Sequence, residues 1–406
     1  MRPAGSPLGV VALLLLWAAA LPHHPFAASP SPRLGAGEWG TPLVALVTAW
    51  VLASVDRSDR WTILRDASAP LVVIVVGLAP SIPFALAPGR AIVQLAVLGY
   101  VASIFAIGHV LGSIDARYGR LLLTGLLVGT IARAVTAWLH PLEDPWLASG
   151  WPRPLGPAES PNMIALQSSA GAVAALVLRR VTTDSRARAA LLASTVLLAA
   201  TTLATLGHAL IAALVAAAFA IWKAWRTSRP RAATIAGTAA ILALLLLGLS
   251  ARTRLVPLHR EPPFLDLRPD LYAAAHEVAL ETFRDRPFTG VGLEGFHDAW
   301  RARDDGRRFA GYVPEGRSYE PGTPIDPHST WLGYLAEGGL CGAAVLVVLV
   351  VLGARAARQR DDRLLDLVLA FAAAGACVAD VLTNRELALV LGVLSVGRRP
   401  FDPRRA

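Results

Sequence analysis

Long apolar segments follow one another along most of the chain, and they constrain the fold more than any other feature. Several are long enough to cross the hydrocarbon core of a bilayer as α-helices, which takes about 20 residues at a rise of about 1.5 Å per residue. The chain is 54% hydrophobic and only 17% charged, whereas soluble domains carry about 25% charged residues. We therefore predict a polytopic membrane protein that is in contact with the lipid bilayer.

The apolar runs predict an all-α fold with about twelve transmembrane helices. The first run follows Arg2 and also resembles a signal peptide, with Ala27-Ala28-Ser29 as a cleavage-like site. A retained first span fits the charge pattern better. The runs lie near residues 8–21, 41–55, 67–87, 91–112, 121–139, 161–178, 189–206, 208–222, 232–250, 329–353, 364–382 and 386–397.

Basic residues set the expected orientation, because cytoplasmic loops of membrane proteins are enriched in Arg and Lys. With the amino end in the cytoplasm and alternating spans, more than half of the 38 Arg and Lys residues fall in cytoplasmic segments. The short outside segments hold only Arg33, Arg90, Arg153 and Arg385. We expect both termini in the cytoplasm. The net charge of +9 then reflects membrane topology and does not indicate nucleic-acid binding.

This topology divides the chain into three parts. Residues 1–250 hold the first nine transmembrane helices, and residues 329–406 hold the last three and a basic cytoplasmic tail. Between them, residues 251–328 form one large outside loop, which is too long for a bare connection and should carry function or structure of its own. Apolar residues recur at helical spacing between 267 and 285, so we expect a helix there that lies on the membrane surface.

His328 ends the large loop and is the first candidate for chemistry. It follows Pro327 and lies at the outer mouth of a span, where an imidazole would be a general base near neutral pH. The alternative is an interfacial histidine that only caps the helix. Glu337 lies one to two turns into the same span, where a carboxylate is costly unless paired. We expect it to bond to a neighbour or to backbone near His328.

Residues 290–295 match the G-x-G-x-x-G pattern of dinucleotide-binding folds. That interpretation needs a preceding strand and a βαβ unit, whereas a predicted helix precedes the pattern here. We reject a nucleotide site. The glycines are better explained by a tight turn after Pro287 that brings backbone close to the membrane or to a substrate.

Three positions are candidates for binding an anion such as a diphosphate. Arg133 lies inside the span 121–139, towards its outer end, where an arginine is functional by default unless it snorkels to the interface. His208 lies at an outer turn between two spans, and Arg286 ends the predicted loop helix. Simple solvation is the alternative for both.

Metal and cofactor chemistry find little support in the sequence. The two cysteines, Cys341 and Cys377, both lie in apolar runs, and their spacing indicates neither a zinc site nor a disulfide framework. Paired acidic residues that could hold a hard cation are scarce in the predicted outside segments. We therefore expect no cofactor and no bound metal.

Three stretches of the chain carry a resemblance to a known family. Residues 286–296, 327–342 and 160–165 are similar to the Pro-rich GVG motif, the histidine motif with its following span, and the Asn motif of the O-antigen ligase and O-antigen polymerase superfamily. These are bacterial polytopic membrane proteins. The likeness covers most of residues 90–385, and the first two motifs in this order around one large loop are fairly specific.

The resemblance implies metal-independent glycosyl transfer at the periplasmic face of the bacterial inner membrane. The donor would be a glycan on undecaprenyl diphosphate, and the acceptor a lipid A core sugar, another glycan chain or a protein hydroxyl. His328 matches the family's essential histidine, the proposed base. Arg268 is the best match for a loop-helix arginine, although it lies about one turn further upstream than usual. His208 stands where the family often has an arginine, so Arg133 or His208 would replace that charge.

Two other functions are compatible with the sequence. A transporter often has twelve spans with both ends inside, but such proteins usually show two related halves, which this sequence lacks. An inactive scaffold in a glycan-assembly complex would account for His208 in place of an arginine. The residues do not distinguish a ligase from a polymerase.

Overall fold

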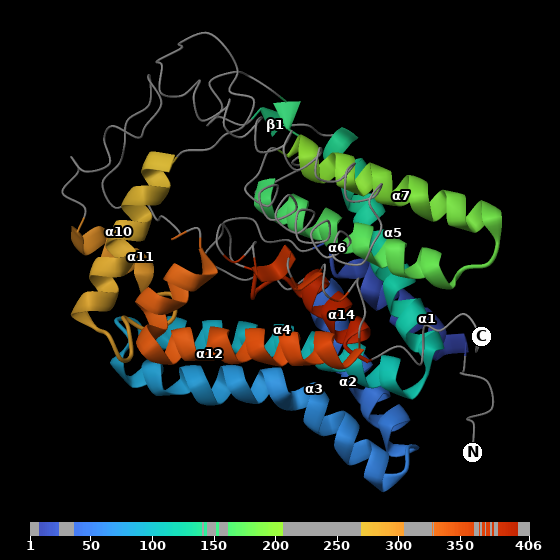
Figure 1. The fold of residues 1–406 in the computed structure, drawn as a ribbon, viewed down its shortest axis with the longest axis horizontal. Coiled ribbons are helices and arrows are strands. Elements are labelled where there is room, and N and C mark those ends of the chain that lie inside the picture. The colour runs from blue at the N-terminus through green and yellow to red at the C-terminus, as the bar shows by residue number, and fades with distance from the viewer. Residues whose placement is uncertain are drawn as a thin grey trace.

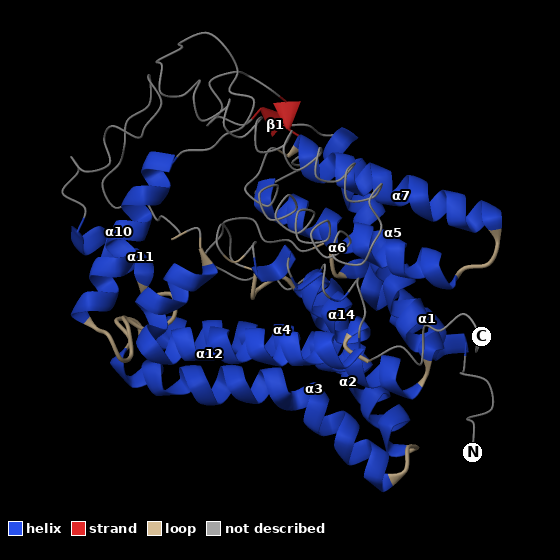
Figure 2. Ribbon diagram, viewed as in Figure 1, coloured by secondary structure: helices blue, strands red, loops and turns tan. Residues whose placement is uncertain are grey.

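The structure is a computed structural model of the chain, and it consists almost wholly of helices where it is described (Figure 2). The exception is one antiparallel pair of two-residue strands, β1 (Leu142–Glu143) and β2 (Pro152–Arg153), in a segment predicted to be a loop. The described residues are 8–23, 36–139, 142–143, 152–153, 161–205, 269–303, 327, 329–360, 365, 368–369, 371–373, 376 and 381–396.

Every apolar run that lies in the described ranges coincides with a helix. In chain order these are α1 (Leu8–Ala20), α2 (Ala36–Ala53), α3 (Arg57–Leu78), α4 (Pro88–Ile114), α5 (Ala116–Leu139), α6 (Pro161–Val181), α7 (Ser185–Ala204), α12 (Thr330–Arg360) and α14 (Arg385–Leu394). The segment 251–328, which is predicted to be an outside loop, contributes α10 (Pro269–Asp285) and α11 (Phe296–Arg303). The first of these confirms the helix predicted over 267–285.

Among the described residues, six helices are long and apolar enough to cross a membrane, namely α3 with its extension to Phe84, α4, α5, α6, α7 and α12. The helix α1 is apolar but shorter. The structure thus supports a multi-pass membrane protein. The predicted total of about twelve spans stays a prediction, because the runs at 208–222 and 232–250 and most of 364–382 lie outside the described residues.

Two predicted cytoplasmic segments are not loops. The segment 56–66 is almost entirely the first turns of α3, and within 113–120 only Asp115 interrupts the helices α4 and α5. A helix satisfies its own backbone hydrogen bonds wherever it runs. It can therefore continue past the apolar run and carry charged side chains into the interface.

Proline shapes the other end of α3. Pro70 lies inside the helix, and Figure 1 shows α3 changing direction along its length. Beyond Leu78 the chain tightens into the 3₁₀ helix η1 (Ala79–Phe84), which contains Pro80 and Pro83. Proline has no backbone N–H and disrupts the α-helical bonding pattern. The predicted span at 67–87 therefore consists of the second part of α3 followed by η1.

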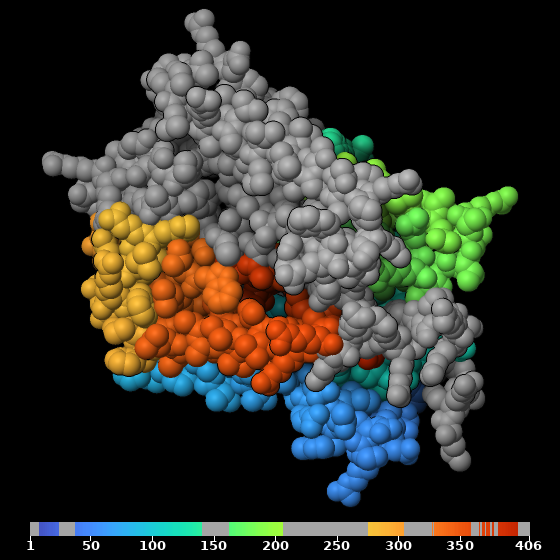
Figure 3. All heavy atoms as spheres, viewed as in Figure 1, coloured from blue at the N-terminus to red at the C-terminus, as the bar shows by residue number. Residues whose placement is uncertain are grey.

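The helices form two groups with α14 between them (Figure 1). In the first group α3 packs against α4 and α12, and α10 packs on α12, as the space-filling view also shows for α3, α10 and α12 (Figure 3). In the second group α5 packs against α1 and α6, and α6 packs against α7. The helix α14 contacts α4 on one side and α6 on the other.

Small residues let α5 approach α1 closely. Gly125 and Gly129 form a GxxxG pattern on α5, and a side chain at these positions would overlap the backbone carbonyls of Leu15 and Ala19. Helices in membranes associate through such close backbone contacts, since burial of apolar surface gives little driving force in lipid. Large side chains such as Leu16 and Val128 remain exposed on the same two helices, as expected for lipid-facing positions.

We predict that Gly129→Leu separates α1 from α5. The free energy of unfolding should fall by at least about 1–3 kcal/mol, the usual cost of overpacking. Gly9→Leu is the matched control, because no atom lies within 4 Å of a side chain at that position. The measurement is the thermal unfolding midpoint of the purified protein in detergent. Equal midpoints for the two variants would contradict this packing.

Candidate functional site

The turn that follows α10 is joined to α12 through main-chain hydrogen bonds. The N–H of Val291 donates to the carbonyl of Ala336 at 3.0 Å, and the N–H of Gly292 donates to that of Glu337 at 2.8 Å. In the opposite direction, the N–H of Leu340 donates to the carbonyl of Pro287 at 2.8 Å. We call this pairing of residues 286–295 with 336–341 the junction.

The junction exists because α12 is broken at Gly339. This residue has φ 58° and ψ −143°, which is not a helical conformation. Gly290 faces it with φ 62°, and a side chain on Gly290 would overlap the backbone of Ala336 and Glu337. Both positions need glycine because positive φ is strained for other residues. The break divides α12 into a short first part that holds the histidine motif and a long second part.

The junction also binds the connection between α3 and α4. The N–H of Leu86 donates to the carbonyl of Val291 at 2.8 Å. A side chain on Gly292 would overlap Ala85, so the two backbones touch. The predicted tight turn is therefore confirmed, and the close backbone approach that the structure shows is to Ala85 and to α12. A helix precedes the turn, as expected when the nucleotide interpretation was rejected.

Glu337 links the junction to α11. Its Oε1 accepts from the backbone N–H of Phe296 at 3.3 Å, at the first residue of α11. A carboxylate at a helix amino end satisfies a free N–H and interacts favourably with the helix dipole. This agrees with the expectation that Glu337 bonds to backbone. It points to a positioning role for this residue.

The loop helices are fixed to the ends of the membrane helices. The side chains of Phe296 and Trp300 are buried with Ala336 and with one face of α10. Arg90 at the start of α4 forms an ion pair with Asp298 of α11. Arg303 in turn pairs with Asp285 at the end of α10. The loop is thus a docked unit with its own small core in the described range 269–303.

Arg286 belongs to the junction. Its Nη1 donates to the carbonyl of Phe84 at 3.1 Å. It lines a shallow surface hollow with Phe84 and Phe288, which are 58% and 70% exposed. The described contacts do not bring Arg286 together with Arg133.

The structure describes the residues on both sides of His328, whereas His328 itself, Arg268 and His208 lie outside the described residues. Ser329 caps α12, since its Oγ accepts from the N–H of Leu332 at 3.3 Å. Thr330 Oγ1 accepts from the N–H of Val381 at 3.1 Å. The backbone around the histidine motif is therefore tied to the segment that leads into α14.

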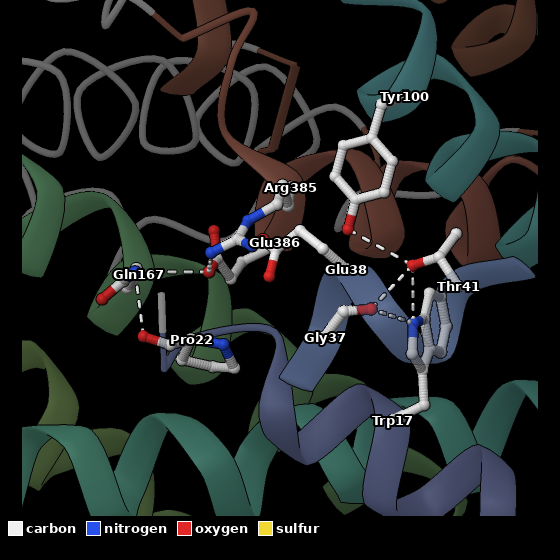
Figure 4. A network of polar contacts seen from close by, with 9 residues as sticks. All are labelled: Trp17, Pro22, Gly37, Glu38, Thr41, Tyr100, Gln167, Arg385 and Glu386. Atoms are coloured by element: carbon white, nitrogen blue, oxygen red, sulfur yellow. Dashed lines mark hydrogen bonds and ion pairs between the residues drawn. The ribbon is translucent and has the colours of Figure 1, made fainter. Parts of the chain in front are cut away.

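A buried ion network surrounds the first residues of α14 (Figure 4). Arg385 forms an ion pair with Glu38 at the start of α2, and its Nη2 lies 3.9 Å from Oε1 of Glu386. Gln167 of α6 donates from Nε2 to that same Oε1 at 3.3 Å and to the carbonyl of Pro22. Arg385 and Glu386 are only 7% and 1% exposed. The network thus joins four segments that are distant in the sequence.

A chain of neutral hydrogen bonds adjoins this network. Trp17 Nε1 donates to Thr41 Oγ1 at 2.9 Å, and Thr41 Oγ1 lies 3.3 Å from the hydroxyl of Tyr100. Figure 4 shows these side chains from α1, α2 and α4 beside the charged ones. Buried polar groups in a membrane protein are costly unless they form hydrogen bonds within the protein. Their bonds fix the start of α2 against α1 and α4.

Arg133 faces the interior of the helix bundle. Its Nε atom is buried, and its charge acts on Glu386 and on His23, which lies in the turn after α1. Partial burial lowers the pKa of His23 below its usual value, the charge of Arg133 lowers it further, and a hydrogen bond to the backbone of Gly129 opposes both. The charge of Arg133 thus acts on groups inside the bundle, and its role in binding an anion stays a prediction.

The charged residues Arg385, Glu386 and Glu38 were not among the predicted site residues. A signal was present, because Glu38 directly precedes the run 41–55 and Arg385-Glu386 opens the run 386–397. Charges at the mouth of a span can equally be solvated, so the sequence alone gives no reason to pair them.

The predicted absence of a metal stays a prediction; in the described ranges no three His, Cys, Asp or Glu side chains converge as ligands would.

We predict that Glu38→Gln destabilises the protein by up to roughly 3–5 kcal/mol, because it removes the nearer of the two carboxylates beside the buried charge of Arg385. Asp66→Asn is the control, since the Arg65–Asp66 pair is exposed on both sides and such pairs contribute about 0–1 kcal/mol. Thermal unfolding in detergent measures both. A Glu38→Gln midpoint as high as that of the control would show that the ion pair contributes little.

Comparison with known proteins links the junction and the histidine motif to one family. A search of curated proteins finds no match to the chain. Residues 187–347 match the family model described as O-Antigen ligase. The matched range begins in α7 and ends within α12, so it contains both loop motifs but neither Arg133 nor Arg385. This match confirms the resemblance inferred from the motifs: over residues 187–347 the chain is similar to the O-antigen ligase family.

Proposed function

We propose that this protein transfers a glycan from undecaprenyl diphosphate to an acceptor hydroxyl, at the periplasmic face of the bacterial inner membrane. The observation that carries the proposal is the family match over residues 187–347. Support comes from the junction, which binds the GVG turn and the first part of α12 into one unit. A turn and a helix start that are fixed in this way could hold reacting groups in register.

In this mechanism His328 is the general base. It removes the proton of the acceptor hydroxyl as that oxygen attacks the anomeric carbon of the donor sugar. The bond between this carbon and the diphosphate oxygen breaks, and the diphosphate leaves with the electron pair. Diphosphate is already a good leaving group, so the reaction needs a base and positive charge more than a strong acid. No metal ion is needed in this scheme.

The cations are proposed to hold the diphosphate of the donor. Arg133 is the best supported by position, since it faces the bundle interior beside His23 and the ion network. Arg268 and His208 remain candidates from the resemblance. We assign Arg286 to the junction instead, because its guanidinium already donates to Phe84. Glu337 is proposed to position the histidine motif through its bond to α11.

We predict that His328→Ala reduces glycan transfer by at least about 10²–10⁴-fold, the usual contribution of a general base, while the protein still inserts into the membrane. The assay measures product formed from an undecaprenyl-diphosphate-linked glycan. His259→Ala, in the same predicted outside loop, is the control and should keep full activity. Full activity in His328→Ala would rule out this base.

For Arg133→Ala we predict a milder loss, with donor affinity reduced about 10–100-fold because a charge-assisted hydrogen bond to phosphate is lost. Arg133→Lys should recover part of it. The readout is the dissociation constant of undecaprenyl diphosphate for the purified protein. Since Arg133 also interacts with Glu386, unfolding midpoints are measured alongside. Unchanged donor affinity would mean that Arg133 does not bind the diphosphate.

A further inference from the structure

An apolar cavity lies beside the ion network, between α3, α4, α12 and α14. Its volume is about 370 Å³, within the range of about 300–1,000 Å³ that is typical of ligand pockets. The walls are mostly aliphatic and aromatic, with Leu98, Ala102 and Phe105 on α4 and Leu387 and Ala388 on α14, and polar or charged residues line only the two ends. A cavity with such walls selects an apolar ligand.

One end of this cavity holds a polar group without a hydrogen-bond partner. Asn384 lines the cavity at the start of α14 and is 2% exposed. Its Oδ1 accepts from the N–H of Leu387 at 2.7 Å and so caps the helix. Its Nδ2 is buried and has no partner among the described residues. A buried N–H donor without an acceptor is unfavourable, so a ligand oxygen that accepts from Asn384 Nδ2 would stabilise the bound state.

At the opposite end the polar and charged lining residues are either exposed, as Asp66 and Arg355 are, or bonded to each other. There His109 Nδ1 and Ser395 Oγ lie 2.6 Å apart and bond to each other. Asp66 lines the same end and pairs with Arg65. The ligand should therefore place its oxygen-bearing end at Asn384 and its apolar chain along α4 and α14 towards His109.

The Asn384 end is also the end nearest to the histidine motif. Val381 and Leu382 line the cavity there. The N–H of Val381 donates to Thr330, two residues after His328. A chain lying in the cavity would thus point its head towards the position where the proposed transfer takes place.

We propose that this cavity binds the first part of the polyprenyl chain of a lipid-linked diphosphate, with Asn384 Nδ2 donating to the oxygen that joins the chain to its head group. The proposal rests on the proposed function, since it names the place of the donor lipid. An ordinary phospholipid acyl chain is the alternative occupant, and the test separates the two.

The first test fills the cavity with a larger side chain and measures which lipid no longer binds. Ala102→Phe places a ring in the cavity, and Ala96→Phe makes the same change at an exposed position of the same helix. Undecaprenyl diphosphate without glycan is the probe, and binding is measured on purified protein by native mass spectrometry. We expect Ala102→Phe to weaken binding at least about tenfold, because apolar chain carbons are displaced. Ala96→Phe should bind as the natural protein does.

A second variant tests the head-group end without changing the volume. Asn384→Asp keeps the helix cap, because Asp and Asn cap equally well, but it replaces the N–H donor by a carboxylate oxygen. We expect binding of undecaprenyl diphosphate to fall about tenfold, through loss of a hydrogen bond and added repulsion. An unfolding midpoint equal to that of the natural protein shows that the cap is intact.

Three further probes define the outcome. Undecaprenol, which keeps the chain and the oxygen, should bind weakly but measurably, and inorganic pyrophosphate should not compete. Phosphatidylglycerol that binds equally well, or Ala102→Phe that binds undecaprenyl diphosphate normally, would overturn the proposal. These results are independent of glycan transfer. If lipid binding behaves as expected but the natural protein transfers no glycan, the proposed function fails and the lipid site stands.

Discussion

The main-chain pairing between the GVG turn and the broken start of α12 is the interaction on which the rest of the site depends. A helix that breaks at the level of the membrane frees backbone N–H and C=O groups, and these groups need partners. Residues 287–292 provide them across the break at Gly339. Conversely, the loop could not dock in this way on an intact helix, whose backbone groups would already be bonded. The break and the loop therefore stabilise each other.

Two polar systems meet at the start of α12 and α14. The junction is built from the segment that matches the O-antigen ligase family. The ion network of Arg385, Glu386 and Glu38 lies in parts of the chain outside that segment. The bond between Thr330 and Val381 is one of several that tie the start of α12 to the segment before α14. In this arrangement the matched segment holds the histidine motif, and the buried charges come from helices outside that segment.

The helices could be predicted from the sequence because the apolar runs are continuous and most of them have a length close to that of a span. The break at Gly339 could not, because Leu335 to Gly342 is a nearly continuous apolar run and the bonds that replace the helical ones come from residues about 50 positions earlier. The turn at Gly290 was predicted, but its contact with α12 was not. Glycines in the sequence indicate a tight turn without indicating which backbone lies next to it. The strands β1 and β2 gave no recognisable signal.

The candidate site was less predictable than the fold. Arg133 was found from sequence because a charge in a span is rare, but a span that is apolar on all sides does not reveal which face is internal. Arg385 and Glu38 were missed because they are 347 residues apart and no local pattern connects them. Pairs of this kind become visible only when the helices have been placed.

The distance between Glu38 and Arg385 along the chain also sets an order of events during synthesis. At about 5–20 residues per second, roughly 20–70 s pass between the emergence of the two side chains from the ribosome. During this interval α2 is complete while its carboxylate has no arginine to neutralise it, and a lone charge in lipid is unfavourable. Glu38 therefore remains without its ion-pair partner until α14 has been made. The contact that fixes the start of α2 thus forms only after nearly all of the chain has been synthesised.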